Sequence, residues 1–557
     1  MKSLKLLMAI AVCLGILHPY ANARENKGAK KRKTTLPTAA LAANCIAPSA
    51  ATELSINNVR ALIQTGGDMW WDLQSEARYE IPKGSGQTSL YAGALWLGGQ
   101  DVSGQLKVAA LRFRRQGQDF WTGPLSTITS EIDAQTCLDW DRHYISTRDE
   151  VAQFVAWNNA KKLAAEGDEE ALKNFEGYQI PNFILDWPAH GRNFPPYDED
   201  FYLAPFTDVN NDGLYNPLEG DYPAFDLKGE IECNKKIENV YGDQNLWWIF
   251  NDKGNIHTET GSAAIGMEIR AQAFAFATND EINNMTFYNY ELINRSTFTL
   301  TETYFGQWVD GDLGNPWDDQ VGCDVMRGLG YYYNANNNDL DASGARGYGV
   351  NPPAVGVDFF QGPFQDNDGI DNPVGIGENE AMNGVGYGDK IVDNERFGMR
   401  RFMYYNNGAG PLGDPMNGAE YYNYLRGFWR DGVPMTYGGT GYNPTDPSAV
   451  QADFMFPGNT DPLHWGTRGE PQADWTIPSG NGDDRRFIQS AGPFILAPGS
   501  VNNITVGIAW ERATSGGPWA SVAALRRADD KAQALFDVCF KLINGPDAPE
   551  MAVQELD

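Results

Sequence analysis

Short segments in which apolar and polar residues alternate constrain the fold of this chain more than any other feature. The clearest segment lies between Met267 and Ala277. One face of it carries Met267, Ile269, Ala271, Ala273 and Ala275. A period of two is typical of strands that bury one face. Turn residues bracket this segment and three similar ones, which are residues 106–114, 286–292 and 504–510. We therefore predict a mainly β fold, in which antiparallel strands form β-sandwich lobes.

The composition indicates that long loops join these strands. The chain has 60 glycines and 31 prolines, and 12% of its residues are aromatic. Such a chain is typical of short strands separated by turn-rich connections. A disordered chain would not carry so many large aromatic side chains, because these need burial or a ligand to cover them. We expect the loops to be rich in Asn, Asp and Gly.

Two segments have the pattern of helices. Thr147 and Glu150 form a capping box ahead of apolar residues, which predicts a helix over about residues 147–175. The second segment, about 521–542, has an apolar stripe with the 3.6-residue spacing. An Asn-Gly-Pro run follows it, and these residues commonly end a helix.

The ends of the chain differ from its middle. Lys2 and Lys5 precede a short apolar run that ends in small residues before Ala23, which is typical of a secretory signal peptide. The apolar run is shorter than the roughly 20 residues that span a bilayer. A basic stretch without apolar periodicity follows it. We expect a signal peptide (1–23), a basic disordered leader (24–54), two β-rich lobes (55–265 and 266–545) and a linker to a further domain of the same polypeptide (546–557).

The strong negative charge of the chain narrows its partners. The formal net charge is −30. A field of this sign repels nucleic acids and anionic membranes, so we expect neither as the main partner. We expect no transmembrane segment either, because no later stretch is long and apolar enough. The expected location is the extracellular medium or the outer cell surface.

Cysteine usage agrees with export but predicts no particular disulfide. An odd number of cysteines remains after the predicted cleavage: Cys45, Cys137, Cys233, Cys323 and Cys539. Pairings cannot be deduced from the sequence, and at least one thiol should be unpaired within the chain or bonded elsewhere. The usual zinc spacings are absent, so a structural zinc site is not expected.

The strongest local motif runs from Asp208 to Glu219. It matches the pattern of an EF-hand loop, in which hard oxygen atoms surround calcium and a glycine permits a sharp turn. Prolines on both sides argue against the two framing helices, so the loop is closer to isolated calcium loops of the dockerin or thrombospondin type 3 kind. A solvated turn is the alternative. The predicted Ca²⁺ ligands are Asp208, Asn210, Asp212, Leu214 through its carbonyl, Asn216 and Glu219.

Two further acidic clusters are weaker metal candidates. Residues 366–372 resemble a thrombospondin type 3 repeat but lack an obvious distal carboxylate. The second cluster follows a predicted strand that ends near Trp308, and so many neighbouring carboxylates need either solvent or a cation. The candidate ligands are Asp366, Asp368 and Asp371 in the first cluster, and Asp310, Asp312, Asp318 and Asp319 in the second, with Asp324 close by.

Several phrases resemble the N-terminal region of large secreted proteins of Bacteroidetes-type bacteria, many of which end in a type IX secretion sorting domain. The matching segments are residues 67–72, 79–83, 93–99, 119–125, 389–399 and 529–549. The resemblance implies export to the cell surface or medium and no defined activity. Because the sequence given ends without the sorting domain, we expect further β-sandwich domains and that domain to follow.

Two classes of function remain at this point. The first is a secreted or cell-surface, calcium-stabilised structural or adhesive binding module without catalysis, whose partner is a surface glycan or an extracellular protein. The alternative is a secreted hydrolase that acts on polysaccharide or protein through a pair of carboxylates. The segments 141–143 and 257–259 contain acid and base residues but no recognised nucleophile frame. Six tryptophans could stack on sugars, although burial in a sandwich core is the expected use: Trp70, Trp71, Trp96, Trp121, Trp247 and Trp248.

Overall fold

The computed structural model describes residues 21–22, 24–25, 43–195, 197–224, 242–342, 344–477, 482–538 and 540. The chain is mainly β, with 33% strand and 15% helix, as the alternating segments predict. The expected signal peptide lies outside the described residues apart from the strand β1 (Ala21–Asn22), and the expected linker lies wholly outside them. Within the described part, no helix combines the length and apolar character needed to cross a membrane.

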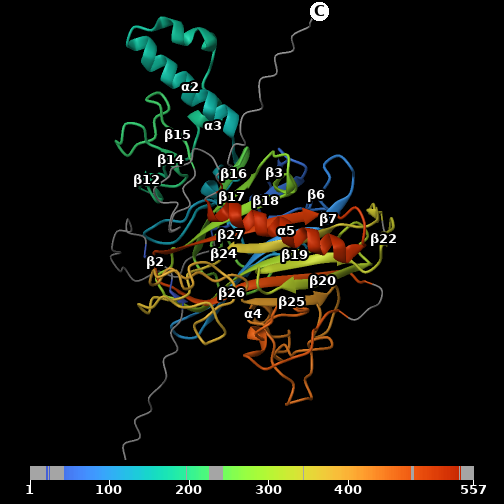
Figure 1. Cartoon of the computed structure of the whole chain (residues 1–557). Coiled ribbons are helices and arrows are strands. Elements are labelled where there is room, and N and C mark those ends of the chain that lie inside the picture. Colours follow the sequence, from blue (N-terminus) through green and yellow to red (C-terminus); the bar gives the residue numbers. More distant parts are fainter. Residues whose placement is uncertain are drawn as a thin grey trace, which may run out of the picture.

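Two large sheets form the body of the molecule (Figure 1). The first sheet has eleven strands and is antiparallel apart from the short edge strand β1. Its main path runs through β1, β26 (Arg485–Leu496), β19 (Leu300–Asp310), β8 (Ala92–Asp101), β5 (Asp68–Met69), β4 (Arg60–Gln64), β6 (Tyr79–Glu80) and β7 (Thr88–Leu90). Off this path, β25 (Arg401–Asn406) pairs with β26, β3 (Ala51–Leu54) with β4, and β9 (Leu106–Ala110) with β8.

The second sheet has ten strands. Its path is β10 (Trp121–Thr122), β16 (Gln244–Asn251), β17 (Met267–Ala275), β18 (Thr286–Asn294), β27 (Ser500–Glu511), β24 (Ala354–Gln361), β21 (Leu329–Asn334) and β20 (Asp319–Asp324). β11 (Tyr144–Thr147) pairs with β16, and β2 (Arg24–Glu25) with β27. Six further strands of the described chain form two-stranded ribbons. In these, β12 (Asn193–Phe194) pairs with β13 (Tyr197–Asp198), β14 (Phe206–Thr207) with β15 (Tyr222–Pro223), and β22 (Asn338–Asp339) with β23 (Gly349–Val350).

The two stretches that we expected to form separate lobes share both sheets. In the first sheet, β8 from the first stretch lies beside β19 from the second. In the second sheet, β16 lies beside β17. The expected leader also overlaps this framework, because β3 lies within residues 24–54 and pairs with β4. The strand order therefore crosses the expected boundary near residue 265 in both sheets.

The main hydrophobic core lies between the sheets. Met267, Ile269 and Ala271 of β17 belong to it, together with Leu97 of β8 and Phe305 of β19. Alternation along β17 places these residues on one face, as the sequence predicts. Burial of such side chains is the main stabilising contribution to a sandwich, at about 25 cal/mol per Å² of apolar surface.

The opposite face of β17 is buried as well, and it carries a charged network. Glu268 and Arg270 are ion-paired at 3.0 Å. Arg295 contacts Glu268 at 2.8 Å, and Asp200 contacts both arginines at 3.0 and 2.9 Å. Because Asp200 comes from the excursion between β11 and β16, that excursion covers this face of the sheet. The period-two pattern alone predicts only one buried face.

Helix α5 (Pro518–Asp537) lies across the outer face of the second sheet (Figure 1). Val522, Leu525 and Ala532 pack in a second core with Leu329 and Phe360. Pro suits the first helical position, because its missing N–H would have no helical partner there. The helix begins three residues before the expected start at 521 and ends five before the expected end at 542.

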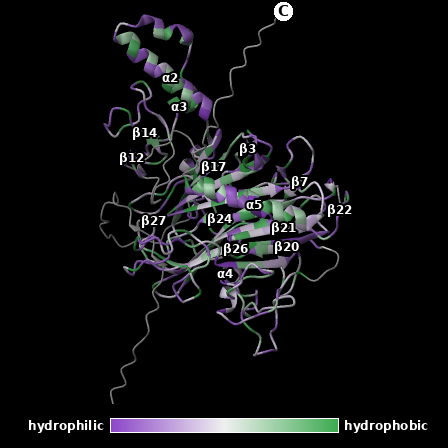
Figure 2. Cartoon of the chain, in the orientation of Figure 1, coloured by the Kyte–Doolittle hydropathy of each residue, from purple (hydrophilic) through white to green (hydrophobic). Residues whose placement is uncertain are grey.

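The other expected helix is confirmed and projects from the body (Figure 1). α2 (Arg148–Ala165) is followed by the 3₁₀ helix η1 (Glu169–Phe175). The Glu150 N–H donates to Thr147 Oγ1 at 3.4 Å, and the Thr147 hydroxyl donates to the Glu150 carboxylate at 2.6 Å. Figure 2 shows hydrophilic and hydrophobic residues mixed along both α2 and α5.

Shorter helices lie outside the two expected regions. They are α1 (Ala134–Asp139), α3 (Asn182–Leu185), α4 (Gly418–Leu425), η3 (Glu281–Asn284) and η4 (Trp465–Thr467). α4 packs closely on β8 because Gly98 has no side chain. A Cβ atom there would lie 2.8 Å from the Tyr422 ring and 3.2 Å from Leu425.

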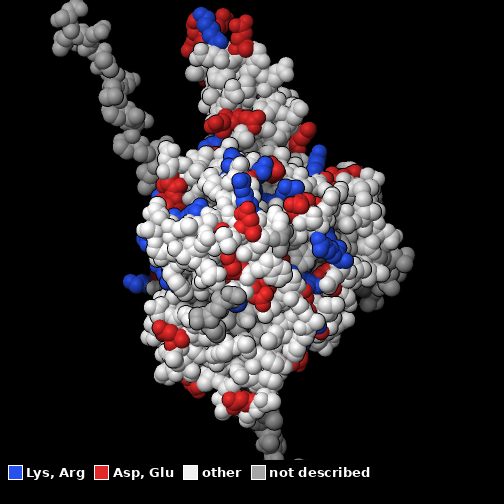
Figure 3. Space-filling model, turned by 90° about the vertical axis from the view of Figure 1, so that its right-hand side faces the viewer, with Lys and Arg blue, Asp and Glu red and all other residues white. Residues whose placement is uncertain are grey.

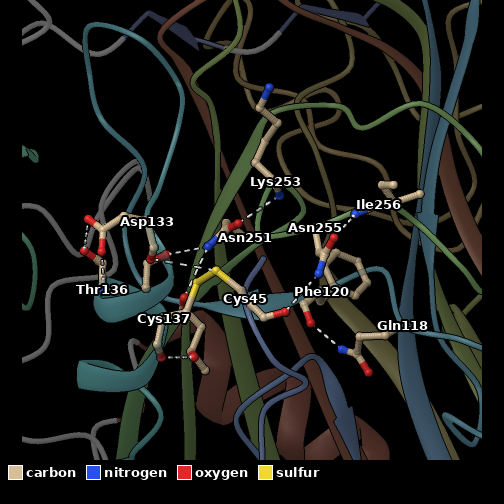
Figure 4. Close-up of a disulfide and its surroundings, with 12 residues drawn as sticks. Cys45, Gln118, Phe120, Asp133, Thr136, Cys137, Asn251, Lys253, Asn255 and Ile256 are labelled. Atoms are coloured by element: carbon tan, nitrogen blue, oxygen red, sulfur yellow. Dashed lines mark hydrogen bonds between the residues drawn. A yellow bond between two sulfur atoms is a disulfide. The ribbon is translucent and has the colours of Figure 1, made fainter. Parts of the chain in front are cut away.

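One disulfide ties the N-terminal part of the described chain to α1 (Figure 4). It joins Cys45 to Cys137, with 5.9 Å between their Cα atoms. The Asn255 side-chain amide donates to the Cys45 carbonyl at 3.1 Å, so the same segment is also held against the loop after β16. Cys323 is a buried free thiol. Cys233 and Cys539 lie outside the described residues.

Candidate functional site

The Asp208 loop (residues 208–219) forms an exposed turn between β14 and β15. The Asp208 carboxylate accepts the N–H groups of Asn211 at 2.6 Å and Gly213 at 2.7 Å. The side-chain amide of Asn210 donates to Asp212 at 3.1 Å and to the Glu219 carboxylate at 2.8 Å. The Asn216 side chain accepts the Leu218 N–H at 3.1 Å, while Leu214 donates its own N–H to Asp212 at 2.8 Å. The predicted ligands therefore share one loop, although their oxygens are engaged within it.

The cluster at residues 366–372 acquires a partner from a distant segment. Asp366, Asp368 and Asp393 have carboxylate oxygens that all lie within 4.8 Å of one another. Among the described residues, no other group of three His, Cys, Asp or Glu side chains is this close. Asp371 is not part of this group. Its oxygens accept the N–H groups of Gly388 at 2.8 Å and residue 390 at 2.6 Å.

The acidic residues from Asp310 to Asp324 do not converge on one point. Asp318 accepts the side-chain amide of Asn334 at 2.9 Å, and Asp319 accepts the Leu313 N–H at 3.0 Å. Asp324 lies between Arg327 at 3.1 Å and Arg526 at 2.9 Å. The remaining two, Asp310 and Asp312, line a pocket.

This pocket has a volume of about 370 Å³ and lies where β19 ends and β26 begins. Asp310 and Arg486 are directly opposite each other in the register of these strands. The pocket is lined by five carboxylates, which are Glu259, Asp310, Asp312, Asp414 and Asp484. Three guanidinium groups line it as well, from Arg112, Arg115 and Arg486. The walls are therefore charged, with an excess of acidic groups.

Two buried arginines lie at the floor of this pocket and form ion pairs with its carboxylates. Arg112 contacts Asp414 at 2.8 Å and Glu259 at 3.1 Å. Arg486 contacts the same Asp414 at 2.8 Å and Asp310 at 3.1 Å. Burial lowers the pKa of both arginines, but the surrounding phenol and carboxylate groups raise it by a larger amount. The pKa of each arginine therefore lies above its usual value. Both guanidinium groups therefore stay charged, and Asp414 bridges them.

Three acidic side chains of the same pocket floor have raised pKa values. Burial raises the pKa of Asp310 to about 7, with a contribution from Asp484, although Arg486 acts against the rise. The pKa of Asp312 is raised well above its usual value by burial and by the charges of Asp310 and Asp484. Burial likewise raises the pKa of Glu259, against the effect of Arg112. The floor therefore combines carboxyl groups of raised pKa with arginines that stay charged.

Three buried oxygens of the floor have no hydrogen-bond partner among the described residues. They are Glu259 Oε2, Asp310 Oδ1 and Asp484 Oδ1. A buried polar atom without a partner costs roughly 1–3 kcal/mol. Such atoms in a pocket wall are positions where a ligand hydroxyl or an ordered water supplies the missing donor.

A second pocket of about 290 Å³ adjoins the first. The two share Tyr91, Asp312 and Pro316, so together they form one polar groove. The second pocket also alternates acidic and basic groups, with Glu53, Glu76 and Glu80 beside Arg60, Arg78 and Arg346. β7, whose Thr88 lines this pocket, lies at the right of Figure 1, the side that Figure 3 turns toward the viewer. Acidic and basic side chains are interspersed on that face (Figure 3).

The aromatic residues of the groove are not those that the sequence singled out. All six candidate tryptophans are buried, in agreement with the expected use in the core. Tyr91 and Phe113 line the first pocket instead, with ring centroids 5.8 Å apart. Trp71 lies directly behind Tyr91 and stacks on it at 6.4 Å. The tryptophan therefore supports the ring that reaches the groove.

The histidines of the segments 141–143 and 257–259 make different contacts. His143 is partly buried, burial lowers its pKa to about 3, and its ring contacts Thr52 Oγ1 at 3.0 Å. His257 is wedged between two carbonyl oxygens, Val108 O at 2.8 Å and Asp252 O at 2.7 Å. Both rings are therefore engaged in the interior, and only Glu259 from these segments reaches the groove.

Sequence reasoning missed most of the groove. Asp310 and Asp312 were candidates as metal ligands, but Arg112, Asp414 and Arg486 stand in no motif. Asp414 is more than 70 residues from Arg486, and only the pairing of β19 with β26 brings Asp310 opposite Arg486. Comparison with protein-family models and with curated protein sequences finds no match for this chain.

Proposed function

We propose that this protein is an exported binding module, secreted or displayed on the outer cell surface, whose polar groove takes a carbohydrate without transforming it. The observation that carries the proposal is the pair of adjoining pockets that share Tyr91, Asp312 and Pro316. A groove made of two adjoining pockets suits a chain of several sugar units better than it suits one compact metabolite.

The chemistry of the walls suits hydroxyl groups. A sugar hydroxyl both donates and accepts, so neighbouring hydroxyls match walls that alternate carboxylates with guanidinium groups. The unpartnered oxygens of Glu259, Asp310 and Asp484 are acceptors for such donors. The rings of Tyr91 and Phe113 offer apolar surface to the C–H face of a sugar. The excess of carboxylates favours neutral or amino sugars over uronic acids.

A glycan array followed by calorimetric titration of the mature chain tests this proposal. We expect binding of a neutral or amino-sugar oligosaccharide, weakened about tenfold or more by Asp312→Asn or Tyr91→Ala. Asp446→Asn is the matched control, because Asp446 is exposed and contacts only its own turn through Ser448. An array without binding, or equal affinities for all four proteins, contradicts the proposal.

A hydrolase is the second candidate, and one observation favours it. Asp310 has a pKa of about 7, and the same pocket contains the Asp414 carboxylate, which is ion-paired with Arg112 and Arg486. Glycoside hydrolysis uses one protonated and one ionised carboxyl group. Release of reducing ends from the bound oligosaccharide, lost in Asp310→Asn, would establish catalysis. Binding without such release supports the binding module.

The export part of the proposal rests on the basic and apolar pattern before Ala23. N-terminal sequencing of the protein recovered from the medium or the cell surface tests it. The expected first residue is Arg24.

A further inference from the structure

Two loop segments that contribute no residue to the groove are held side by side. They are residues 366–372 and 389–395. The Gly369 N–H donates to Asp393 Oδ1 at 2.7 Å, and the Asn372 N–H donates to a Glu395 oxygen at 2.5 Å. Asp371 also joins the segments through the two N–H groups that its carboxylate accepts. The backbone thus fixes the relative position of the carboxylates on the two segments.

Three carboxylates converge at this junction. Asp366 and Asp368 come from the first segment and Asp393 from the second, with oxygens within 4.8 Å of one another. An acidic cluster by itself is common on protein surfaces. Here, however, one member is buried, and one of its oxygen atoms lacks a hydrogen-bond partner among the described residues.

That member is Asp366, which is 4% exposed. Its Oδ1 atom has no hydrogen-bond partner among the described residues. Its Oδ2 atom has only two long contacts, with the side-chain amides of Gln365 at 3.4 Å and Asn372 at 3.5 Å. A buried carboxylate in this position is costly unless a cation or a proton neutralises it.

We propose that Asp366, Asp368 and Asp393 bind a calcium ion that joins the two segments. Calcium accepts six to eight hard oxygen ligands in flexible geometry, so three carboxylates together with water form a suitable set. Asp368 is exposed, which leaves room for that water. Magnesium requires a more regular octahedral arrangement and fits this open set less well.

The role of each acidic residue follows from its contacts. Asp371 joins the two segments through the N–H groups that its oxygens accept, and it is not one of the three carboxylates that converge. Asp393 supplies the distal carboxylate that residues 366–372 lack. The site shares no residue with the groove, so the calcium proposal can be tested independently of carbohydrate binding.

Calorimetric titration with Ca²⁺ tests the site in a background that removes the other candidate loop. The starting protein is Asp208→Ala/Asp212→Ala. We expect one calcium ion to bind, with a Kd on the order of 10⁻⁴ to 10⁻³ M, typical of extracellular modules. Adding Asp393→Asn or Asp368→Asn should weaken binding at least tenfold, whereas adding Asp446→Asn should leave it unchanged.

Hydrogen exchange of the same proteins provides a second readout. Calcium should slow exchange of the amides in residues 366–372 and 389–395, and Asp368→Asn should remove this protection. Because Asp368 is exposed, this variant should fold, and an unchanged circular dichroism spectrum checks that it does. Absence of calcium binding in the starting protein, or equal affinity after Asp393→Asn and Asp368→Asn, overturns the proposal.

Discussion

Asp310 illustrates how a single carboxyl group can link the groove to stability. Its pKa of about 7 in the folded chain exceeds the value of about 3.9 for an unperturbed aspartate. A raised pKa means that folding favours the protonated form. The resulting contribution to stability is complete below about pH 4 and is lost as the pH rises through 7.

We therefore expect the free energy of unfolding to fall by about 2–3 kcal/mol through this group between pH 5 and pH 8. Denaturant titrations at a series of pH values measure the change. Asp310→Asn keeps the shape of the side chain but cannot ionise, so its stability should vary less over this interval. Parallel pH profiles for the two proteins would show that Asp310 is already ionised at pH 5.

Glu268 behaves in the opposite sense. Burial raises its pKa, but Arg295 and Arg270 lower it by more, so the pKa of Glu268 lies below its usual value. The stability that this ionised group contributes is present above the unfolded pKa of about 4.3 and is lost as the pH falls through the folded value. The charged face of β17 should therefore favour acid unfolding.

Glu268→Gln removes the charge from this network and leaves Arg270 buried with fewer partners. We expect a loss of about 3–5 kcal/mol in the free energy of unfolding at pH 7, because breaking a buried ion pair leaves an uncompensated charge. Glu169→Gln, on the exposed surface of η1, is the control and should change stability by less than about 0.5 kcal/mol. Urea unfolding of the three proteins measures both effects. Equal midpoints for all three would mean that solvent reaches the network.

At the scale of single elements, the Asp208 loop is the clearest case in which a motif predicts chemistry. The Asp208 carboxylate already gathers three N–H groups of its own turn, those of residues 211, 212 and 213. This arrangement holds the loop in a curved form before any ion arrives. Calcium binding by residues 208–219 stays a prediction.

We expect calcium at ten times its Kd to raise the stability of the folded chain by roughly 1–2 kcal/mol through this loop, because the ion binds only the folded state. Asp208→Ala/Asp212→Ala should remove this part of the response, and Glu219→Gln should weaken it. Thermal melting with calcium and with chelator measures the difference. If the double variant responds as the wild type does, the loop is a solvated turn.

For the whole molecule, the disulfide between Cys45 and Cys137 is the main covalent constraint among the described residues. It closes a loop with a sequence separation of 92. A cross-link of this span restricts the unfolded chain strongly and stabilises the folded state by about 2–5 kcal/mol. It also ties the segment before β3 to α1 (Figure 4).

Cys45→Ser/Cys137→Ser should therefore lower the free energy of unfolding by about 2–5 kcal/mol. Reduction of the wild type should have the same effect, whereas a reducing agent should not change the double variant. Denaturant unfolding with and without the reducing agent measures all four states. A wild type that is insensitive to reduction would contradict the constraint.

Local patterns in the amino-acid sequence predict the class of secondary structure. The alternation from Met267 to Ala275 predicts a strand, and the capping box at Thr147 predicts the start of α2, because backbone geometry and nearest-neighbour contacts decide both. The same local reasoning places the predicted Asp208 ligands on a single turn. Short-range patterns therefore account for the mainly β fold and for the two longest helices.

Contacts between residues distant in the sequence depend on how the strands and loops pack. Strand order merges the two expected lobes into shared sheets, and it brings Asp310 opposite Arg486 to build the groove. It also places Asp393 beside Asp366, where the sequence indicated Asp371. The physical reason is that strand pairing and loop packing depend on burial across the whole core, and the periodicity of one segment carries no information about its distant partner.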